Sequence, residues 1–348
     1  MAQSDNKFLR EIVGPHNPTR AEIRKLPATQ RVKWRANSAL SDGNLENVNL
    51  SGGYYDAGDN VKFGWPMAFS VSLLSWAATE YKNEINSAKQ LPNLRSAIKW
   101  GTDFLIRAHT SSTTLYTQAK AIETTNLGSG GRHGHPEHRI RSLPLRRNRG
   151  GGRGGRPCRA IVFRDSIPNI LATPVTPLGN GNIEDLIVDL AHSIAPIRLS
   201  GGLLYTRDSS NLQYVTSASM ILLVYSKILT EARADGVQCG SVKFSASKIK
   251  SFAKSQVDYI LGSNPLKMSY MVGFGSKYPT QLHHRGASIP SIQAHPAKVG
   301  CSDGLSTYYS SSKPNPNIHV GAIVGGPDSN DHFTDSRSDF HIWSPQLI

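Results

Sequence analysis

SGGYYDAGDNVKFGWP, residues 51–66, is the stretch from which the rest of the chain can be interpreted. It sets two aspartates, Asp56 and Asp59, in a glycine-containing turn with aromatic residues on both sides. Two carboxylates in such a turn can point at one water molecule, and each raises the basicity of the other. An Asp-Gly pair alone is typical of an ordinary turn. The prediction of a chemical site therefore rests on the whole stretch.

Apolar residues recur at helical spacing directly after this turn and again in the second half of the chain. The sets are Met67, Val71, Leu74 and Ala78; Leu94, Ile98, Gly101 and Leu105; Tyr214, Ala218, Ile221, Tyr225 and Leu229; and Ile249, Ala253, Val257 and Ile260. A shorter candidate covers residues 183–194. Residues 273–312 are rich in Gly, Pro, Ser and His, which is typical of functional loops on a rigid scaffold. Because strand-like alternation is scarce, we predict an all-α fold.

The net charge of +14 is concentrated in one short segment. Residues 131–160 contain nine arginines and one glutamate, and they have no lysine or aspartate. The rest of the chain is only mildly basic. The charge therefore does not indicate a nucleic-acid-binding surface spread over the whole protein.

Two later stretches of the sequence are considered together with residues 51–66. SYMVGFGSKYPTQLHHRG covers residues 269–286, and GPDSNDHFTDSRSDF covers residues 326–340. Together with residues 51–66, they resemble the active-site motifs of glycoside hydrolase family 9, which includes the plant endo-β-1,4-glucanases, or cellulases.

The family fold is an (α/α)6 barrel of paired helices with the active site in loops at one end. The resemblance implies one catalytic domain over residues 21–348, with two matching blocks at residues 25–118 and 201–340. The apolar periodicity supports only about five helices, and the region between the blocks matches poorly. We therefore expect an incomplete (α/α)6 barrel whose central helices are altered or missing.

Hydrolysis of a glycosidic bond needs one carboxylate that activates water and one carboxylic acid that protonates the leaving oxygen. The resemblance implies an inverting endo-hydrolase of β-1,4-glucan, with Asp59 as the general base and Asp56 assisting it. At the position of the acidic glutamate, four residues after Phe340, this chain has Ser344. A serine hydroxyl is a poor proton donor near neutral pH, so we expect hydrolysis to be impaired. The alternative is an inactive remnant that binds glucan.

The resemblance also assigns the other half of the site. His283 and Asp335 fall at active-site positions, where Asp335 supports and orients the site, and Arg285 falls at a substrate-binding position. Imidazole and guanidinium groups can donate hydrogen bonds to sugar hydroxyls. A histidine pair such as His283 and His284 can instead be a structural cap. A metal site is not expected, because no matching His or Cys cluster accompanies the pair.

Aromatic side chains are candidates for sugar-stacking platforms. Trp65, beside the aspartate turn, is expected to line a sugar subsite, whereas Trp100 falls within a helical pattern and is expected to pack internally. Tyr205 is a second candidate for substrate binding, and an ordinary core tyrosine is the open alternative at that position.

Residues 125–196 interrupt the resemblance. Within them, residues 132–159 read RHGHPEHRIRSLPLRRNRGGGRGGRPCR. A shift of one nucleotide in the reading frame permits Asp-Met-Asp-Thr-Pro, which family 9 carries at this point, so we interpret the segment as a frame disruption. The alternative is an Arg/Gly arm that binds nucleic acid. The segment lacks the Phe, Tyr or Trp residues on which bases stack, so we expect no nucleic-acid partner.

The expected partner is the β-1,4-glucan substrate, bound by a monomer without a cofactor. The family implies an extracellular or cell-wall location, although residues 1–10 lack the apolar core of a signal peptide. No stretch was expected to reach the roughly 20 apolar residues of a membrane span, and therefore no membrane association is expected.

Overall fold

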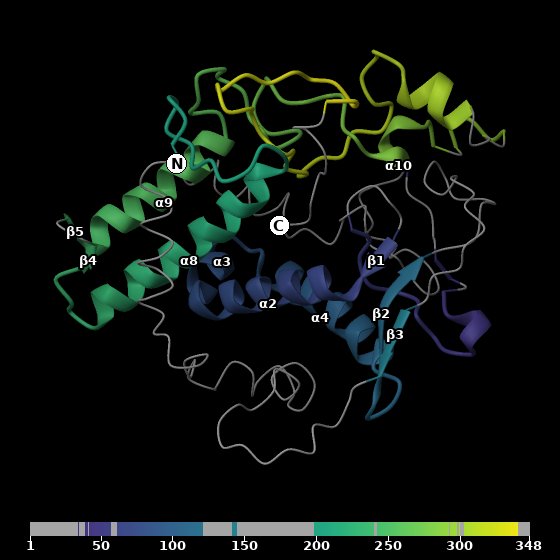
Figure 1. Cartoon of the computed structure of the whole chain (residues 1–348), viewed down its shortest axis with the longest axis horizontal. Helices are drawn as coiled ribbons and strands as arrows, with labels where there is room; N and C mark the ends of the chain where they lie inside the picture. Colours follow the sequence, from purple (N-terminus) through teal and green to yellow (C-terminus); the bar gives the residue numbers. More distant parts are fainter. Residues whose placement is uncertain are drawn as a thin grey trace.

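The computed structural model describes residues 34, 39–40, 42–56, 61–120, 141–144, 198–239, 242–291, 293–297, 299 and 303–339. Helices dominate this part of the chain (Figure 1). The elements in order are η1 (Asn44–Glu46), β1 (Val61–Phe63), α2 (Gly64–Glu80), α3 (Lys82–Ser87), α4 (Leu91–Ala108), β2 (Thr114–Lys120), β3 (Arg141–Pro144), α8 (Asn211–Glu231), β4 (Val237–Cys239), β5 (Val242–Phe244), α9 (Ala246–Ile260), α10 (Arg285–Ser288) and η2 (Gly304–Tyr309).

The four long helices predicted from apolar periodicity are confirmed as α2, α4, α8 and α9. The candidate helix at residues 183–194 lies outside the described residues, as does most of the interrupted segment 125–196. Of the arginine-rich stretch, only the backbone of β3 is described. It pairs with β2, so this short part forms a strand.

The first block is built around the packing of α2 against α4. Its core includes Met67 and Val71 from α2 and Leu94, Ile98 and Phe104 from α4. Gly101 lets the two helices approach closely: a Cβ atom there would lie 2.5 Å from Cγ2 of Val71. The predicted apolar faces of both helices therefore do form one core.

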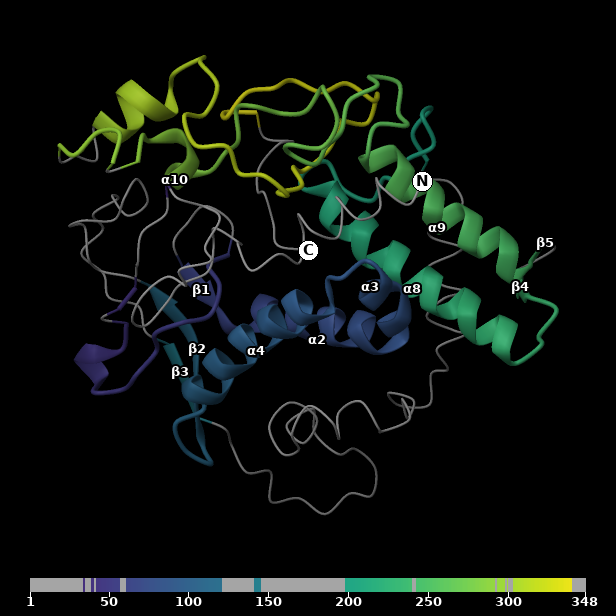
Figure 2. The same cartoon turned by 180° about the vertical axis from the view of Figure 1, so that it is seen from behind.

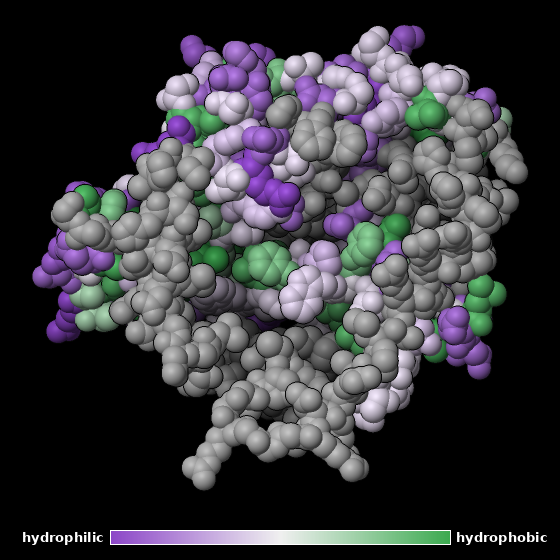
Figure 3. All heavy atoms as spheres, viewed as in Figure 1, coloured by the Kyte–Doolittle hydropathy of each residue, from purple (hydrophilic) through white to green (hydrophobic). Residues whose placement is uncertain are grey.

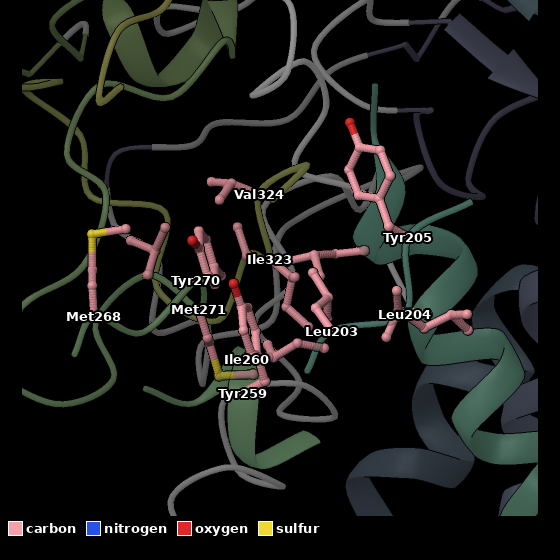
Figure 4. Packing of buried hydrophobic residues seen from close by; sticks show 14 of the residues in the cluster. Leu203, Leu204, Tyr205, Tyr259, Ile260, Met268, Tyr270, Met271, Ile323 and Val324 are labelled. Carbon is pink, nitrogen blue, oxygen red and sulfur yellow. The ribbon is translucent and has the colours of Figure 1, made fainter. Parts of the chain in front are cut away.

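The second block is built around the antiparallel pair α8 and α9, which run side by side in Figures 1 and 2. Its main cluster joins this pair to the loops that follow α9. Figure 4 shows Leu203 on the side of Tyr259, Tyr270 and Met271, whereas the Leu204 side chain of the same cluster is directed away from these three. The described loops between α9 and residue 339 gather at one end of the helix pair (Figure 1).

One predicted core position on α8 is wrong. Tyr214 is 37% exposed, and its hydroxyl accepts a hydrogen bond of 2.5 Å from Arg207. The buried stripe of α8 instead begins at Leu212 and Val215 and continues through Ala218. The error arises because α8 is apolar over more than one face, so helical periodicity alone fits two neighbouring registers.

The length of α8 also corrects the expectation about membrane spans. Within the described residues, α8 is long and apolar enough to cross a bilayer by length and composition alone. Half of its most apolar window is buried against the rest of the protein. A buried core helix passes the same test, so the observation does not indicate a membrane segment.

Two small antiparallel sheets accompany the helices. The order β1-β2-β3 joins Val61 to Lys120 and Phe63 to Gln118, and β4 pairs with β5 as a hairpin. These strands were not predicted. Four of the five have only three or four residues, too few for a period-two pattern to stand out, and the seven residues of β2, TLYTQAK, do not alternate regularly between apolar and polar types. The first sheet matters for the site, because β1 follows the aspartate turn directly.

Few described contacts join the two blocks. Lys227 of α8 donates hydrogen bonds of 2.9 Å to both the main-chain oxygen and Oε2 of Glu80, at the end of α2. Trp34 lies edge-on to the rings of His284 and His319, with centroid distances of 6.5 and 6.2 Å. The first contact joins α8 to α2, and the ring contacts of Trp34 join the first part of the chain to the loops around His284 and His319.

The helix α2 is apolar on almost every side, yet only Met67 and Val71 are buried in it. Trp65 is 84% exposed and Phe69 is 52% exposed. Figure 3, drawn from the same side as Figure 1, shows hydrophobic side chains exposed in the middle of the molecule. A helix that is hydrophobic all round is normally covered on all sides, so the sequence of α2 suits a more fully enclosed position than the described neighbours provide.

Candidate active site

Two side chains of α4 donate hydrogen bonds to residues 51–53, the segment that precedes Asp56. Trp100 Nε1 donates a hydrogen bond of 2.8 Å to the carbonyl of Gly53, and an Arg107 nitrogen donates one of 3.1 Å to the carbonyl of Ser51. Gly53 has a φ of 74°, and a Cβ there would lie 2.6 Å from the Phe104 ring. Glycine is required at this point by both conformation and space. Trp100 is therefore an internal packing residue, as expected.

Lys62 of β1 lies fully buried beneath the same segment. Its ammonium group contacts Asp42 Oδ2 at 2.5 Å, donates to the carbonyl of Leu50, and sits 4.9 Å from the ring centre of Phe104. Burial lowers the pKa of Lys62, and the charge of Asp42 acts in the opposite direction. This buried ion pair ties residues 42–50 to the strand that follows the aspartate turn.

The aspartate turn is closed by its own backbone. The amide of Asp56 donates a hydrogen bond of 2.8 Å to the carbonyl of Val61, and the two residues form an isolated β-bridge. Asp56 is half-buried. Asp59 lies between these two anchors but outside the described residues. The hydrogen bond between Asp56 and Val61 thus joins the two described ends of this turn.

The second half of the site consists of two loop segments that run parallel. The amide of Gln281 donates to Asp335 Oδ1 at 2.9 Å, and His283 Nδ1 lies 2.8 Å from the carbonyl of Arg337. In both contacts the two residues are 54 positions apart in the sequence. The two segments are therefore aligned with the same offset along their length. Residues 280–283 and 335–337 therefore form a single paired unit.

Asp335 is held at the centre of this unit. Its carboxylate accepts hydrogen bonds from the amides of Thr280 and Gln281 and from the Thr280 hydroxyl, the last at 2.7 Å. Three hydrogen bonds to one carboxylate hold it in a fixed orientation. This arrangement suits the supporting and orienting role predicted for Asp335.

Asn315 and Arg337 contribute to the site and were missed by the sequence analysis. Asn315 donates from its backbone to the carbonyl of Thr280 and from its side chain to the carbonyl of Leu282. Arg337 is only 2% exposed, and its Nε donates to Asn315 Oδ1 at 2.5 Å. Nothing in the local sequence pattern marks these contacts, because each joins loops that lie far apart in the chain.

The neighbours of His283 have separate roles. His284 is buried and precedes α10, where its Nδ1 accepts a hydrogen bond of 3.0 Å from the amide of Ala287. The second histidine of the pair is thus a helix cap, one of the alternatives for such a pair. Arg285 is the first residue of α10. Its backbone places it two residues after His283, and its side chain lies outside the described part of the structure.

Of the two aromatic candidates, Trp65 presents its ring to solvent at the start of α2. Tyr205 is 8% exposed, belongs to the main cluster of the second block, and donates a hydrogen bond of 3.2 Å to Asp208 Oδ1. Figure 4 shows its hydroxyl directed away from the cluster. The burial of the ring favours the core alternative for Tyr205. Within the described residues, no group of three or more metal-binding side chains occurs.

The environment of Tyr205 raises the pKa of its phenol. Burial, followed by the negative charge of Asp208, raises its pKa to about 12. Below pH about 10 the phenol is protonated in both folded and unfolded chains. Above that value the unfolded phenol ionises first, so the stability contributed by Tyr205 is lost as the pH rises toward 12.

An ultraviolet difference titration of the native chain against Tyr205→Phe isolates this phenol. The missing tyrosinate signal is expected at about pH 12 in the folded protein and near pH 10 in guanidinium chloride, which is the control. A native signal already complete near pH 10 would show that the hydroxyl is solvated.

Comparison with known proteins places this chain among relatives of known class. The model of glycosyl hydrolase family 9 matches residues 22–139 and 179–345. The chain is 45% identical to an endoglucanase of Phaseolus vulgaris, over 92% of this chain and 84% of that protein. It is 42% identical to endoglucanase 20 of Arabidopsis thaliana, over 92% of this chain and 87% of that protein.

Solved structures show the same fold. The endoglucanase from the termite Nasutitermes takasagoensis matches with a TM-score of 0.67 and 25% identity, over 98% of this chain and 95% of that one. The cellulase Cel9M of C. cellulolyticum, in complex with cellobiose, matches with a TM-score of 0.70 and 21% identity, over 98% and 94%.

Fold and sequence together define the class: a glycoside hydrolase of the (α/α)6-barrel type. The match of the family model over most of the chain then identifies the family. The chain belongs to glycosyl hydrolase family 9.

Proposed function

We propose that this chain binds β-1,4-glucan across the loops of residues 262–339 and the aspartate turn, and that the site is built for inverting endo-hydrolysis. Asp59 would act as the general base on water, and Asp56 would assist it. His283, Arg285 and Asp335 would hold and orient the sugar, with Trp65 as a stacking surface. The whole of residues 21–348 would form this single catalytic domain.

The paired unit of residues 280–283 and 335–337 is the observation that carries this proposal. It holds the Asp335 carboxylate and the His283 imidazole in one register, through hydrogen bonds to a backbone amide and a backbone carbonyl. Preorganised groups of this kind can hold a sugar ring while positive charge develops at its anomeric carbon. The endoglucanase relatives make β-1,4-glucan the substrate class that we infer.

We infer that the copy is incomplete and frame-disrupted between the two blocks. The alignment to the Phaseolus vulgaris endoglucanase extends over 419 positions, whereas the whole chain has 348 residues. Positions of that relative therefore have no counterpart in this chain. The uncovered apolar surface of α2, with Trp65 and Phe69 exposed, supports the same inference.

A second function, glucan binding without hydrolysis, is favoured by one observation. Ser344 stands where the family carries its acidic glutamate, so the leaving oxygen has no proton donor at that position. Loss of general acid catalysis typically costs about 10²- to 10⁴-fold in rate. Binding contacts do not depend on that proton and would persist. We also propose that the protein works as an extracellular monomer without a cofactor or a nucleic-acid partner.

Product release from a soluble cellulose derivative tests the hydrolase, and retardation in a glucan-containing gel tests binding. Asp59→Ala is expected to lower any hydrolysis by at least about 10²-fold while leaving retardation largely intact. Asp103→Ala, which changes an exposed carboxylate on α4, is the matched control and should leave both measurements unchanged. Retardation without product would identify the binding remnant, and the absence of both would refute the glucan site.

A further inference from the structure

We propose that Tyr309 and Arg337 are positioning residues that set the tautomer and the orientation of the His283 ring, so that Nε2 accepts a hydrogen bond from a sugar hydroxyl. The proposal rests on the proposed function for its ligand, a glucan hydroxyl. It rests on the described geometry alone for the state of the ring. The two parts can be tested separately.

The tautomer follows from the partner of Nδ1. The carbonyl of Arg337 lies 2.8 Å from this nitrogen. A carbonyl oxygen can only accept a hydrogen bond, so Nδ1 must carry the proton. In a neutral imidazole the other nitrogen is then an acceptor. Side-chain chemistry alone had suggested that His283 would donate to the sugar.

Tyr309 completes the arrangement from the helix η2. Its hydroxyl lies 2.7 Å from His283 Nδ1 and donates a hydrogen bond of 3.0 Å to the same carbonyl of Arg337. Since its proton points at that carbonyl, the phenol oxygen offers a lone pair to the Nδ1 proton. The two rings meet edge to face, with an interplanar angle of 86° and centroids 5.4 Å apart. This contact limits rotation of the imidazole.

Arg337 holds the shared carbonyl in place. Its guanidinium donates to Asn315 Oδ1 and to the carbonyls of Ser311 and Lys313. These three acceptors belong to the loop that follows η2. The buried fork thus connects the backbone of residue 337 to the loop after Tyr309, so the carbonyl and the phenol keep a constant relation to His283. A planar fork with several donors suits this task, and a lysine could not reproduce it.

The proposed tautomer of His283 determines which groups of a ligand can bind at Nε2. A glucan hydroxyl can donate a proton to Nε2, whereas a group that can only accept would face an acceptor without a hydrogen between them. The site would therefore favour a ligand with a free hydroxyl at the position facing His283. Derivatives in which that hydroxyl is methylated would be rejected.

The tautomer is measured without any glucan. A long-range proton–nitrogen correlation spectrum of the protein labelled at histidine nitrogen, recorded at about pH 8.5, above the ordinary imidazole range, distinguishes the two neutral forms. His283→Gln identifies the relevant signal among the 12 histidines. We expect the Nδ1–H form in the native chain and a mixture of tautomers in Arg337→Lys. A native Nε2–H form would overturn the proposal.

The role of Tyr309 is measured by affinity for a cellooligosaccharide. Tyr309→Phe removes only the hydroxyl, and we expect it to weaken binding by about fivefold, the effect of one net hydrogen bond. In the His283→Gln background the same change should have less than about a twofold effect, because the two residues act through one contact. Tyr308→Phe, the neighbouring tyrosine of η2, is the matched control and should leave affinity unchanged.

An equal loss in both backgrounds would show that Tyr309 acts independently of His283, and would refute its positioning role. The two failures can be told apart. If the native chain binds no cellooligosaccharide, the proposed function fails, while the tautomer spectra of the native chain and Arg337→Lys still decide the state of the ring. If binding is present but His283 is in the Nε2–H form, only the positioning proposal fails.

Discussion

Replacing Ser344 with glutamate is expected to raise the rate of glucan hydrolysis by about 10²- to 10⁴-fold, the typical contribution of general acid catalysis. Residue 344 is nine positions after Asp335, in the register at which the family places its proton donor. In the proposed function, the paired unit around Asp335 and the aspartate turn would supply the remaining parts of the site. A carboxylic acid at position 344 would protonate the leaving oxygen as the bond breaks.

The measurement is the release of reducing ends from a soluble cellulose derivative by the native chain and by Ser344→Glu. Ser344→Gln is the matched control, since it has nearly the same size but cannot donate a carboxyl proton. The added acid should also introduce a falling limb at high pH, because only the protonated form acts. A first product of inverted anomeric configuration would agree with the proposed mechanism.

Two other outcomes of this measurement are informative. A Ser344→Glu variant that binds glucan as well as the native chain but releases no product would mean that the incomplete barrel does not bring residue 344 to the aspartate turn. A rise of the same size in Ser344→Gln would exclude proton donation as the cause. Either result would contradict this prediction.

Replacing Lys62 with methionine is expected to destabilise the protein by about 3–5 kcal/mol. The side chain of Lys62 has no exposed surface, and that of its partner Asp42 is 1% exposed. Removing the ammonium group leaves a buried carboxylate without its counter-ion and takes a donor from the carbonyl of Leu50. Because β1 closes the aspartate turn, glucan hydrolysis should fall together with stability.

Urea unfolding followed by circular dichroism measures the effect. Lys99→Met is the matched control: Lys99 is 69% exposed and pairs with Asp103 on the surface of α4, so its loss should cost less than about 1 kcal/mol. In the double variant Lys62→Met with Asp42→Leu, much of the lost stability should return, because no buried charge remains. A cost for Lys62→Met no greater than that of Lys99→Met would show that the ion pair does not stabilise the fold.

The long helices could be predicted because their signal is local. Met67 and Val71 on α2 and Ile98 and Leu105 on α4 repeat at the helical period, and burial of that face is what makes the segment helical. Where a helix is apolar on several faces, as in α8, the same signal leaves the register open. This is why Tyr214 was wrongly assigned to the core.

The candidate site divides in the same way. The aspartate turn and the two later motifs could be found because each is a contiguous run of residues whose types suit the chemistry of glycoside hydrolysis. Asn315, Tyr309 and Arg337 could not be found, because each acts on His283 or its neighbours from a separate loop. A hydrogen bond between residues far apart in the chain leaves no periodic or compositional trace.

The family and the helical class follow from the chain alone, because they depend on which residues occur in which order. The assignment of Asp59 as the base and of Ser344 to the position of the acid rests on the same order of residues and stays a prediction. The direction in which His283 offers a hydrogen bond depends on the tertiary structure. The proton of an imidazole goes to the nitrogen that faces an acceptor, and only the fold brings the carbonyl of Arg337 to Nδ1.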